Sequence, residues 1–231
     1  ISSGLTARTG RVLSDAVFPK NILIVTDENA LAASAGLLES LTEAGFSLKK
    51  LIYPDMKYAR MESVNEVVGL CHDVEGVLSV GTGSINDICR VATFRAGKRF
   101  AIFATAPSMD GYASVGSALI LEGMKVTLNA DVPKAIIADV NVLKNSPFDM
   151  IQSGYGDIIG KYSCLNDWKL ANVVNSEYIC DYIYNLTFDM LLSSFCKENG
   201  FGFIEMQSRE ELHNPEIYVE DKVHFNQRGY D

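Results

Sequence analysis

Polar residues that could bind a ligand follow three short apolar runs, at the point where each run ends. They lie at residues 26–28, 81–87 and 105–110. Apolar runs of this length are typical of buried parallel strands, and such sheets bind ligands at the carboxyl ends of their strands. The three segments are therefore the places where a ligand is expected to bind.

The second segment has the clearest chemistry. Gly81 and Gly83 let the backbone approach a ligand because they carry no Cβ. A helical pattern begins at Ser84, and a helix N-terminus offers free N–H groups and positive dipole charge, which suit a phosphate. Ser84 and Asp87 also have the spacing of a capping box, so an ordinary capped helix start is the alternative.

Strand and helix patterns alternate through the first half of the chain. Strands are predicted at residues 21–28, 47–53, 76–80 and 99–105, with helices at 30–44, 62–72 and 84–96. This alternation predicts an α/β fold with a parallel sheet.

The pattern changes further along the chain. Residues 117–128 and 135–140 are predicted as β segments of a hairpin, with the turn at 129–133. Helical patterns over 155–168 and 176–196 then predict a mostly helical region. We therefore expect two domains, 1–150 and 151–231, the second truncated or composite after about residue 195.

Composition limits the function classes. The 231 residues carry a formal net charge of −9, which argues against general binding to nucleic acid or to an anionic membrane surface. The sequence shows no signal peptide and no apolar run long enough to span a bilayer. The five dispersed cysteines form no CxxC motif and indicate reduced thiols of a cytoplasmic protein.

Several motifs in one order resemble a known family. They are residues 26–29, 81–87, 105–112, 133–139, 154–161 and 166–169. Together they resemble the sn-glycerol-1-phosphate dehydrogenases, within the group of glycerol dehydrogenases, iron-type alcohol dehydrogenases and dehydroquinate synthases. The resemblance covers about residues 1–190 and implies a Rossmann-like domain followed by an all-helical domain.

The resemblance implies that NAD or NADP binds in the cleft between these domains. The pyrophosphate contacts would be Gly83, Ser84, Ile85, Asn86 and Asp87. The contacts on the nicotinamide side would be Thr105, Ala106, Pro107, Ser108 and Ser114. Asp27 would face the adenosine ribose, and its alternative interpretation is a solvated strand end.

Two aspartates correspond to the family's chemical residues. Asp110 resembles the aspartate that contacts substrate, although Asp followed by Gly is also a common turn. Asp157 resembles the metal ligand, or it pairs with Lys161 as an ordinary helix carboxylate. Lys125 could attract a substrate phosphate, or it is simply a solvated lysine.

The resemblance implies a divalent metal, expected to be zinc, and a catalytic zinc needs three protein ligands. The family supplies two of them as histidines, but His72, His213 and His224 do not match its histidine motifs. The chain is then a truncated or degenerate member, or part of a longer protein.

The last residues suggest a different chemistry. Asp221 and His224 have the Asp-x-x-His spacing found at the end of GDSL-type esterases. The sequence has no Gly-Asp-Ser block to supply the nucleophile, since Gly156 and Asp157 precede an isoleucine. A polar loop is therefore the favoured interpretation of this tail.

The resemblance implies metal-assisted, NAD(P)-dependent reduction of dihydroxyacetone phosphate to sn-glycerol 1-phosphate, or of a related polyol or phosphate substrate. One alternative is a protein that binds the nicotinamide cofactor without turnover. Others are a dehydroquinate synthase-like lyase and a structural fragment. The expected partner is a small phosphorylated triose or polyol, and self-association is left open.

Overall fold

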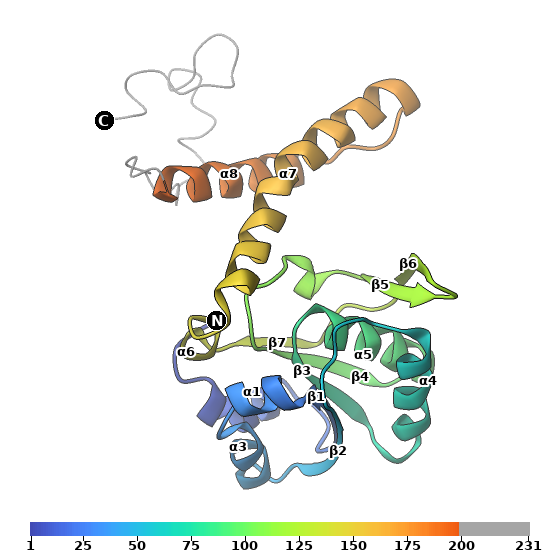
Figure 1. Cartoon of the computed structure of the whole chain (residues 1–231), viewed down its shortest axis with the longest axis vertical. Helices are drawn as coiled ribbons and strands as arrows, with labels where there is room; N and C mark the ends of the chain where they lie inside the picture. The colour runs from blue at the N-terminus through green and yellow to red at the C-terminus, as the bar shows by residue number, and fades with distance from the viewer. Residues whose placement is uncertain (199–231) are drawn as a thin grey trace. The chain divides into compact units, whose positions relative to one another are not determined.

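The computed structural model describes residues 1–198 (Figure 1). By its internal contacts the chain divides into two compact units, Ile1–Asp157 and Ile158–Asp231. The first unit carries every candidate site residue that the sequence analysis placed at the strand ends.

The first unit is built on a five-stranded parallel sheet with the strand order β2-β1-β3-β4-β7. Its strands are β1 (Asn21–Asp27), β2 (Ser47–Tyr53), β3 (Gly76–Gly81), β4 (Arg99–Ala104) and β7 (Ala135–Ala138). All four pairings are parallel, which confirms the predicted α/β class. The strands are apolar because both faces of the sheet are covered.

Helices cover the two faces through alternate residues of each strand. On β1, Ile22 and Ile24 pack in a cluster that includes Leu13 and Leu41. These two leucines belong to α1 (Thr9–Asp15) and α3 (Leu37–Glu43). Figure 1 shows both helices on one face of the sheet.

Leu23 and Val25 of β1 pack on the opposite face, against α4 (Met61–Leu70) and α5 (Gly83–Ala96). α5 contributes eight buried residues, so it is fixed firmly to the sheet. The helix that follows the glycine turn is therefore a rigid support for a site at its N-terminus.

The N-terminal segment is tied to the end of β7 through Asp139. This segment includes η1 (Thr6–Arg8). Asp139 is 2% exposed and caps the short helix α6 (Val140–Leu143) by accepting from Asn141 N. Its two carboxylate oxygens also accept from Gly4 N and from the backbone and side chain of Thr6.

Two sequence predictions were wrong in detail. The helix predicted over residues 30–44 is two helices, α2 (Glu28–Ala33) and α3, separated by Gly36 with φ +92°. The predicted hairpin has different strands: β5 (Gly116–Leu121) pairs antiparallel with β6 (Met124–Asn129). Residues 135–138 instead extend the parallel sheet as β7, because β4 offers them an open edge.

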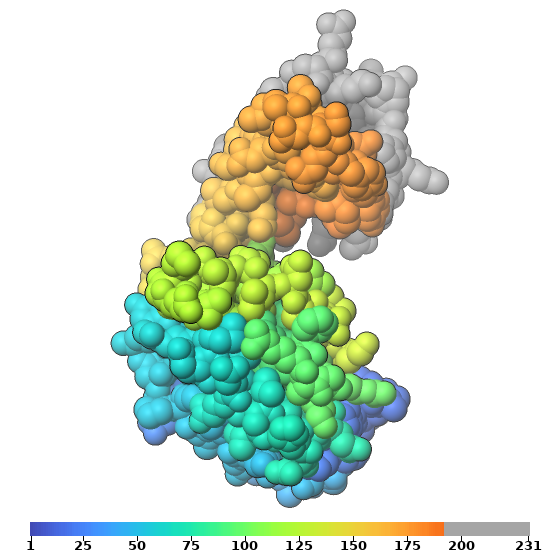
Figure 2. All heavy atoms as spheres, turned by 90° about the vertical axis from the view of Figure 1, so that its right-hand side faces the viewer, coloured from blue at the N-terminus to red at the C-terminus, as the bar shows by residue number. Residues whose placement is uncertain are grey.

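The β5–β6 hairpin lies on the surface beside α4 and α5. Ile120 N donates to the carbonyl of Ala59 at 2.7 Å, and Leu119 is fully buried in the cluster formed with those helices. In Figure 2 the hairpin is the yellow-green patch next to the cyan and teal residues of the helices.

The second unit is helical within the described residues. It contains most of α7 (Phe148–Asn175) and all of α8 (Asp181–Glu198). Trp168 Nε1 donates to the Tyr178 carbonyl at 3.0 Å, and Lys169 lies 4.4 Å from the ring centre of Tyr184. The first contact joins α7 to the connection between the helices, and the second joins α7 to α8. The helical character of this unit agrees with the predicted change from α/β to α.

Candidate functional site

The candidate residues gather at the carboxyl edge of the parallel sheet. Gly81 at the end of β3 is paired with Ala104 of β4, which in turn is paired with Ala138 of β7. The backbone N–H of Thr105 donates to the Gly81 carbonyl at 3.2 Å. The glycine turn and the segment after β4 are therefore neighbours at this edge. Ligands of parallel sheets bind at the same edge.

The start of α5 differs from the predicted capping box. Thr82 is the N-cap residue, and no described side chain caps the helix. Ser84 Oγ instead donates to the Lys57 carbonyl at 3.1 Å. Because the first turn of a helix has N–H groups without intrahelical acceptors, this N-terminus suits an anion better than a capped one would.

Packing around the turn explains its glycines. A Cβ on Gly81 would lie 3.0 Å from Ile85 Cγ1, and a Cβ on Gly83 would lie 3.3 Å from Met109 Sδ. Both distances are tighter than ordinary contacts, so the turn is closely enclosed. Side chains at either position would displace neighbours that shape the helix start.

Two of the predicted pyrophosphate contacts have side chains that face the core. Ile85 is 1% exposed, and Asn86 is fully buried with its Oδ1 accepting from Ser79 Oγ at 2.6 Å. Asn86 Nδ2 has no hydrogen-bond partner among residues 1–198. Ile85 could therefore contact a cofactor through its backbone N–H group, whereas the Asn86 N–H already donates to the Thr82 carbonyl at 3.1 Å.

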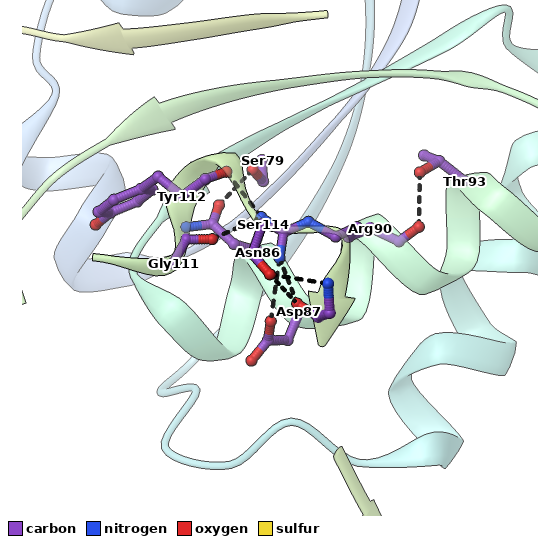
Figure 3. A network of polar contacts seen from close by, with 9 residues as sticks. Ser79, Asn86, Asp87, Arg90, Thr93, Gly111, Tyr112 and Ser114 are labelled. Atoms are coloured by element: carbon purple, nitrogen blue, oxygen red, sulfur yellow. Dashed lines mark hydrogen bonds and ion pairs between the residues drawn. The ribbon is translucent and has the colours of Figure 1, made fainter. Parts of the chain in front are cut away.

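Asp87 belongs to a buried polar network rather than to the turn itself (Figure 3). Its Oδ1 lies 3.7 Å from Arg90 Nη1, and its side chain is 18% exposed. Burial raises the pKa of Asp87 to about 6, while Arg90, the Ala118 N–H, Ser117 and Lys125 act in the opposite direction. Lys125, for which the sequence left open a role near a substrate phosphate or a solvated lysine, is exposed on β6.

The segment after β4 carries the predicted nicotinamide contacts. Thr105 and Ala106 are buried, whereas Pro107 and Ser108 are partly exposed. Tyr112 Oη donates to the Ala106 carbonyl at 2.6 Å, and burial raises the Tyr112 pKa to about 12. The tyrosine therefore stays protonated near neutral pH and can keep this bond, which folds the segment back on itself.

Ser114 lies at the end of the same segment, after η3 (Gly111–Ala113). Its hydroxyl accepts from Gly116 N at 2.8 Å and is exposed. Asp27, at the end of β1, accepts from Ala30 N at 2.8 Å and so caps α2. This capping role was in neither interpretation of the sequence analysis, and it leaves the second carboxylate oxygen of the partly exposed Asp27 for another contact.

Asp110 and Asp157 lie together although 47 residues separate them. Asp110 N donates to Asp157 Oδ2 at 3.0 Å. Gly154, one turn earlier on α7, makes this approach possible, because a Cβ there would overlap the carbonyl oxygen of Pro107. Both aspartates are exposed, so their carboxylates lie at a solvent-accessible edge of the first unit.

The described residues do not fit a metal ion by themselves. Within residues 1–198, no group of three His, Cys, Asp or Glu side chains could hold one. His72 is exposed on η2 (Cys71–Asp73). The remaining histidines, His213 and His224, and Asp221 lie outside the described residues. The structure therefore does not test the esterase-like or the polar-loop interpretation of the tail.

Sequence reasoning missed Arg90, whose side chain is 1% exposed. Its guanidinium donates to the carbonyls of Gly111, Tyr112 and Gly116 at 2.8–3.1 Å. The available signal was an arginine three residues after Asp87 in an otherwise apolar stretch of helix. Gly154 was also missed, and nothing in its local sequence separates it from Gly156.

Residues 1–147, more than half of the chain, match the family described as iron-containing alcohol dehydrogenases. Among curated relatives, the glycerol-1-phosphate dehydrogenase (NAD(P)+) of Halalkalibacterium halodurans is 30% identical over 186 residues, which cover 78% of this chain and 46% of the relative. The enzyme of the same name from Bacillus velezensis is 35% identical over 161 residues, 67% and 41% of the two chains. The chain thus spans about half the length of these relatives.

Solved structures share the fold at low identity. A glycerol dehydrogenase from Schizosaccharomyces pombe superposes with a TM-score of 0.62 at 19% identity, over 70% of this chain and 42% of the other. An NADH-dependent butanol dehydrogenase A from Thermotoga maritima gives a TM-score of 0.62 at 18% identity, over 69% of this chain and 47% of the other.

Among the helices of residues 1–198, none combines the length and apolar composition needed to cross a membrane.

Proposed function

The chain belongs to the iron-containing alcohol dehydrogenase family, as its motifs predicted, and from that premise we propose that it binds NAD or NADP at the start of α5. The observation that carries this proposal is the helix N-terminus behind Gly81 and Gly83, which no described side chain caps. A pyrophosphate there would accept from the backbone N–H groups of the first turn. The names of the curated relatives support a nicotinamide cofactor.

We further propose that the protein reduces dihydroxyacetone phosphate to sn-glycerol 1-phosphate or acts on a related phosphorylated polyol. The relatives named for glycerol 1-phosphate support this substrate class. A bound nicotinamide would supply the hydride. The segment 105–108 and Ser114 would hold its ring, Asp27 would face the ribose, and Asp110 would orient the substrate.

Asp157 is proposed as one ligand of a divalent ion, with zinc as the expected metal and iron suggested by the family's description. Its carboxylate is exposed and close to the Asp110 backbone, which places the two proposed chemical residues together. The remaining ligands would have to come from outside residues 1–198. A cytoplasmic location is proposed because the described cysteines are free.

The experiment measures NADH binding by quenching of protein fluorescence, followed by NADH oxidation with dihydroxyacetone phosphate and added zinc or iron. Gly83→Asp should weaken NADH binding at least about tenfold, because it places a negative charge beside the proposed pyrophosphate. Asn65→Asp adds the same charge on the exposed surface of α4 and should leave binding unchanged. Equal binding by both variants would reject the site.

Turnover is a separate outcome of the same experiment. NADH oxidation that stops on chelation would support the metal-assisted dehydrogenase. Binding without oxidation under any metal would support the alternative of a cofactor-binding member without turnover. Activity on a dehydroquinate synthase substrate instead would show that the reaction, but not the cofactor site, was assigned wrongly.

A further inference from the structure

Arg90 is a buried cation whose guanidinium donates, within residues 1–198, to one distant segment through Nη1 and Nη2, while its Nε has no partner there. Its Nη1 donates to the Gly116 carbonyl at 2.8 Å, and its Nη2 donates to the carbonyls of Gly111 and Tyr112 at 3.1 and 2.8 Å. A buried guanidinium is tolerated only when it is paired and hydrogen-bonded, because desolvation of an uncompensated charge is costly. Arg90 is therefore built into this arrangement, as Figure 3 shows.

The three carbonyls lie at both ends of the segment 111–116, which is the last part of the connection from β4 to β5 and includes the first residue of β5. Besides η3, the segment is supported at its end, where Ala130 N donates to the Val115 carbonyl at 2.8 Å and Gly116 begins β5. The segment carries Ser114, follows Asp110 directly, and is folded back to Ala106 by the hydroxyl of Tyr112. Arg90 thus fixes the backbone that presents the proposed nicotinamide and substrate contacts.

The N-terminus of the same helix is the proposed pyrophosphate site, whereas Arg90 lies near its middle. α5 is buried along the sheet and begins at Gly83, two turns before Arg90. One rigid element therefore determines both where the pyrophosphate would bind and where the segment 111–116 lies. Such an arrangement sets the distance between the two halves of a dinucleotide site, which is what orientation of a hydride donor requires.

We propose that Arg90 is a positioning residue that holds the segment 111–116 at the nicotinamide end of the cofactor site, with Asp87 balancing its charge. The role at the nicotinamide end rests on the proposed function, whereas the hold on the segment does not. The groups that face Asp87 are Arg90 on α5, the Ser117 hydroxyl and Ala118 N–H on β5, and Lys125 on β6. Arg90 is the nearest cation to it in this set, at 3.7 Å.

The first test measures amide hydrogen exchange in the full chain for Arg90→Gln and Arg90→Lys. Exchange in residues 111–116 should rise about tenfold or more in Arg90→Gln, because three carbonyls lose a charged donor. Arg90→Lys should restore part of the protection, since an ammonium can still donate to some of these oxygens. If the Arg90→Gln protein does not fold, the comparison is made with Arg90→Lys alone.

Arg95→Gln is the matched control, because Arg95 is exposed on the same helix and its Nη1 donates to Met61 Sδ at 3.3 Å. It should leave the exchange of residues 111–116 as in the unmodified chain. Unchanged exchange in folded Arg90 variants, or an equal rise in Arg95→Gln, would overturn the inference whether or not the protein binds NADH.

The second test compares ADP-ribose with NADH as probes. ADP-ribose contains the adenosine and pyrophosphate half alone, so its affinity should change less than about twofold in Arg90→Lys. NADH should lose about tenfold, because its additional contacts depend on the held segment. Equal losses for both probes would contradict a role at the nicotinamide end. Failure of either probe to bind the unmodified chain would instead reject the proposed function.

Discussion

The backbone N–H of Asp110 donates to Asp157 Oδ2 at 3.0 Å, which joins the segment after β4 to the beginning of α7. The two residues are the ones that the family resemblance marks for substrate and metal. The bond gives Asp157 a structural role that is independent of any chemical role, because its carboxylate holds the backbone of Asp110. A useful test must therefore separate the charge of Asp157 from its hydrogen bond.

Asp157→Asn makes that separation. An amide oxygen can still accept from Asp110 N, so the melting temperature should stay close to that of the unmodified chain. If the carboxylate charge acts on metal or substrate, NADH oxidation should fall about 100-fold or more. Asp149→Asn, in the first turn of the same helix, should retain activity. Full activity in Asp157→Asn would contradict a chemical role for the charge.

Gly154 and Gly156 form a matched pair on α7. A Cβ at Gly154 would overlap the Pro107 carbonyl, whereas a Cβ at Gly156 meets nothing within 4 Å. Gly154→Ala should therefore lower the free energy of unfolding by about 1–3 kcal/mol. Gly156→Ala should raise it by up to about 1 kcal/mol, because alanine favours the helix. Urea unfolding measures both, and equal effects would show that α7 does not need this close approach.

Asp139 should make stability depend on acidic pH. Burial raises its pKa, but the hydrogen bonds from Thr6, Asn141 and Gly4 outweigh burial and lower the pKa from its ordinary value of 3.8. A lowered pKa in the folded state adds stability above the unfolded pKa, and that stability is lost as pH falls through the folded pKa. Asp139→Asn should cost about 2 kcal/mol at neutral pH.

The cost of Asp139→Asn should shrink as the pH falls below 3.8, because the native carboxylate itself becomes protonated as the pH passes through its lowered pKa. Urea unfolding at several pH values measures this difference. A cost that is the same at neutral and acidic pH would mean that the carboxylate charge does not hold the N-terminal segment.

Asp87 should titrate differently when Arg90 is removed. Burial raises its pKa to about 6, and Arg90 is the largest influence that lowers it. In Arg90→Gln the pKa should therefore rise above 6, as measured by carbon NMR of the carboxyl group, whereas Arg95→Gln should leave it unchanged. Since the folded pKa is above the unfolded one, protonation of Asp87 favours folding as pH falls through about 6.

The sequence by itself determined the parallel α/β domain and the glycine turn. The periodicity that identifies a strand or a helix lies within one short segment. Apolar runs of strand length that alternate with helical patterns are therefore compatible with few other folds. The hairpin was predicted wrongly because the sequence pattern of a strand does not say which other strand it pairs with. Its local signal was the two-residue turn at Glu122 and Gly123, whose φ angles of +51° and +79° are those of tight hairpins.

Only the tertiary structure decided what surrounds the site. The partners of Arg90 lie 21–26 residues away, and Asp110 meets Asp157 across 47 residues. Gly154 and Gly156 look alike in the sequence, and only the approach of Pro107 separates them. Local patterns determine which segments form strands and helices, whereas burial, close packing and hydrogen bonding between distant segments determine what each side chain can do.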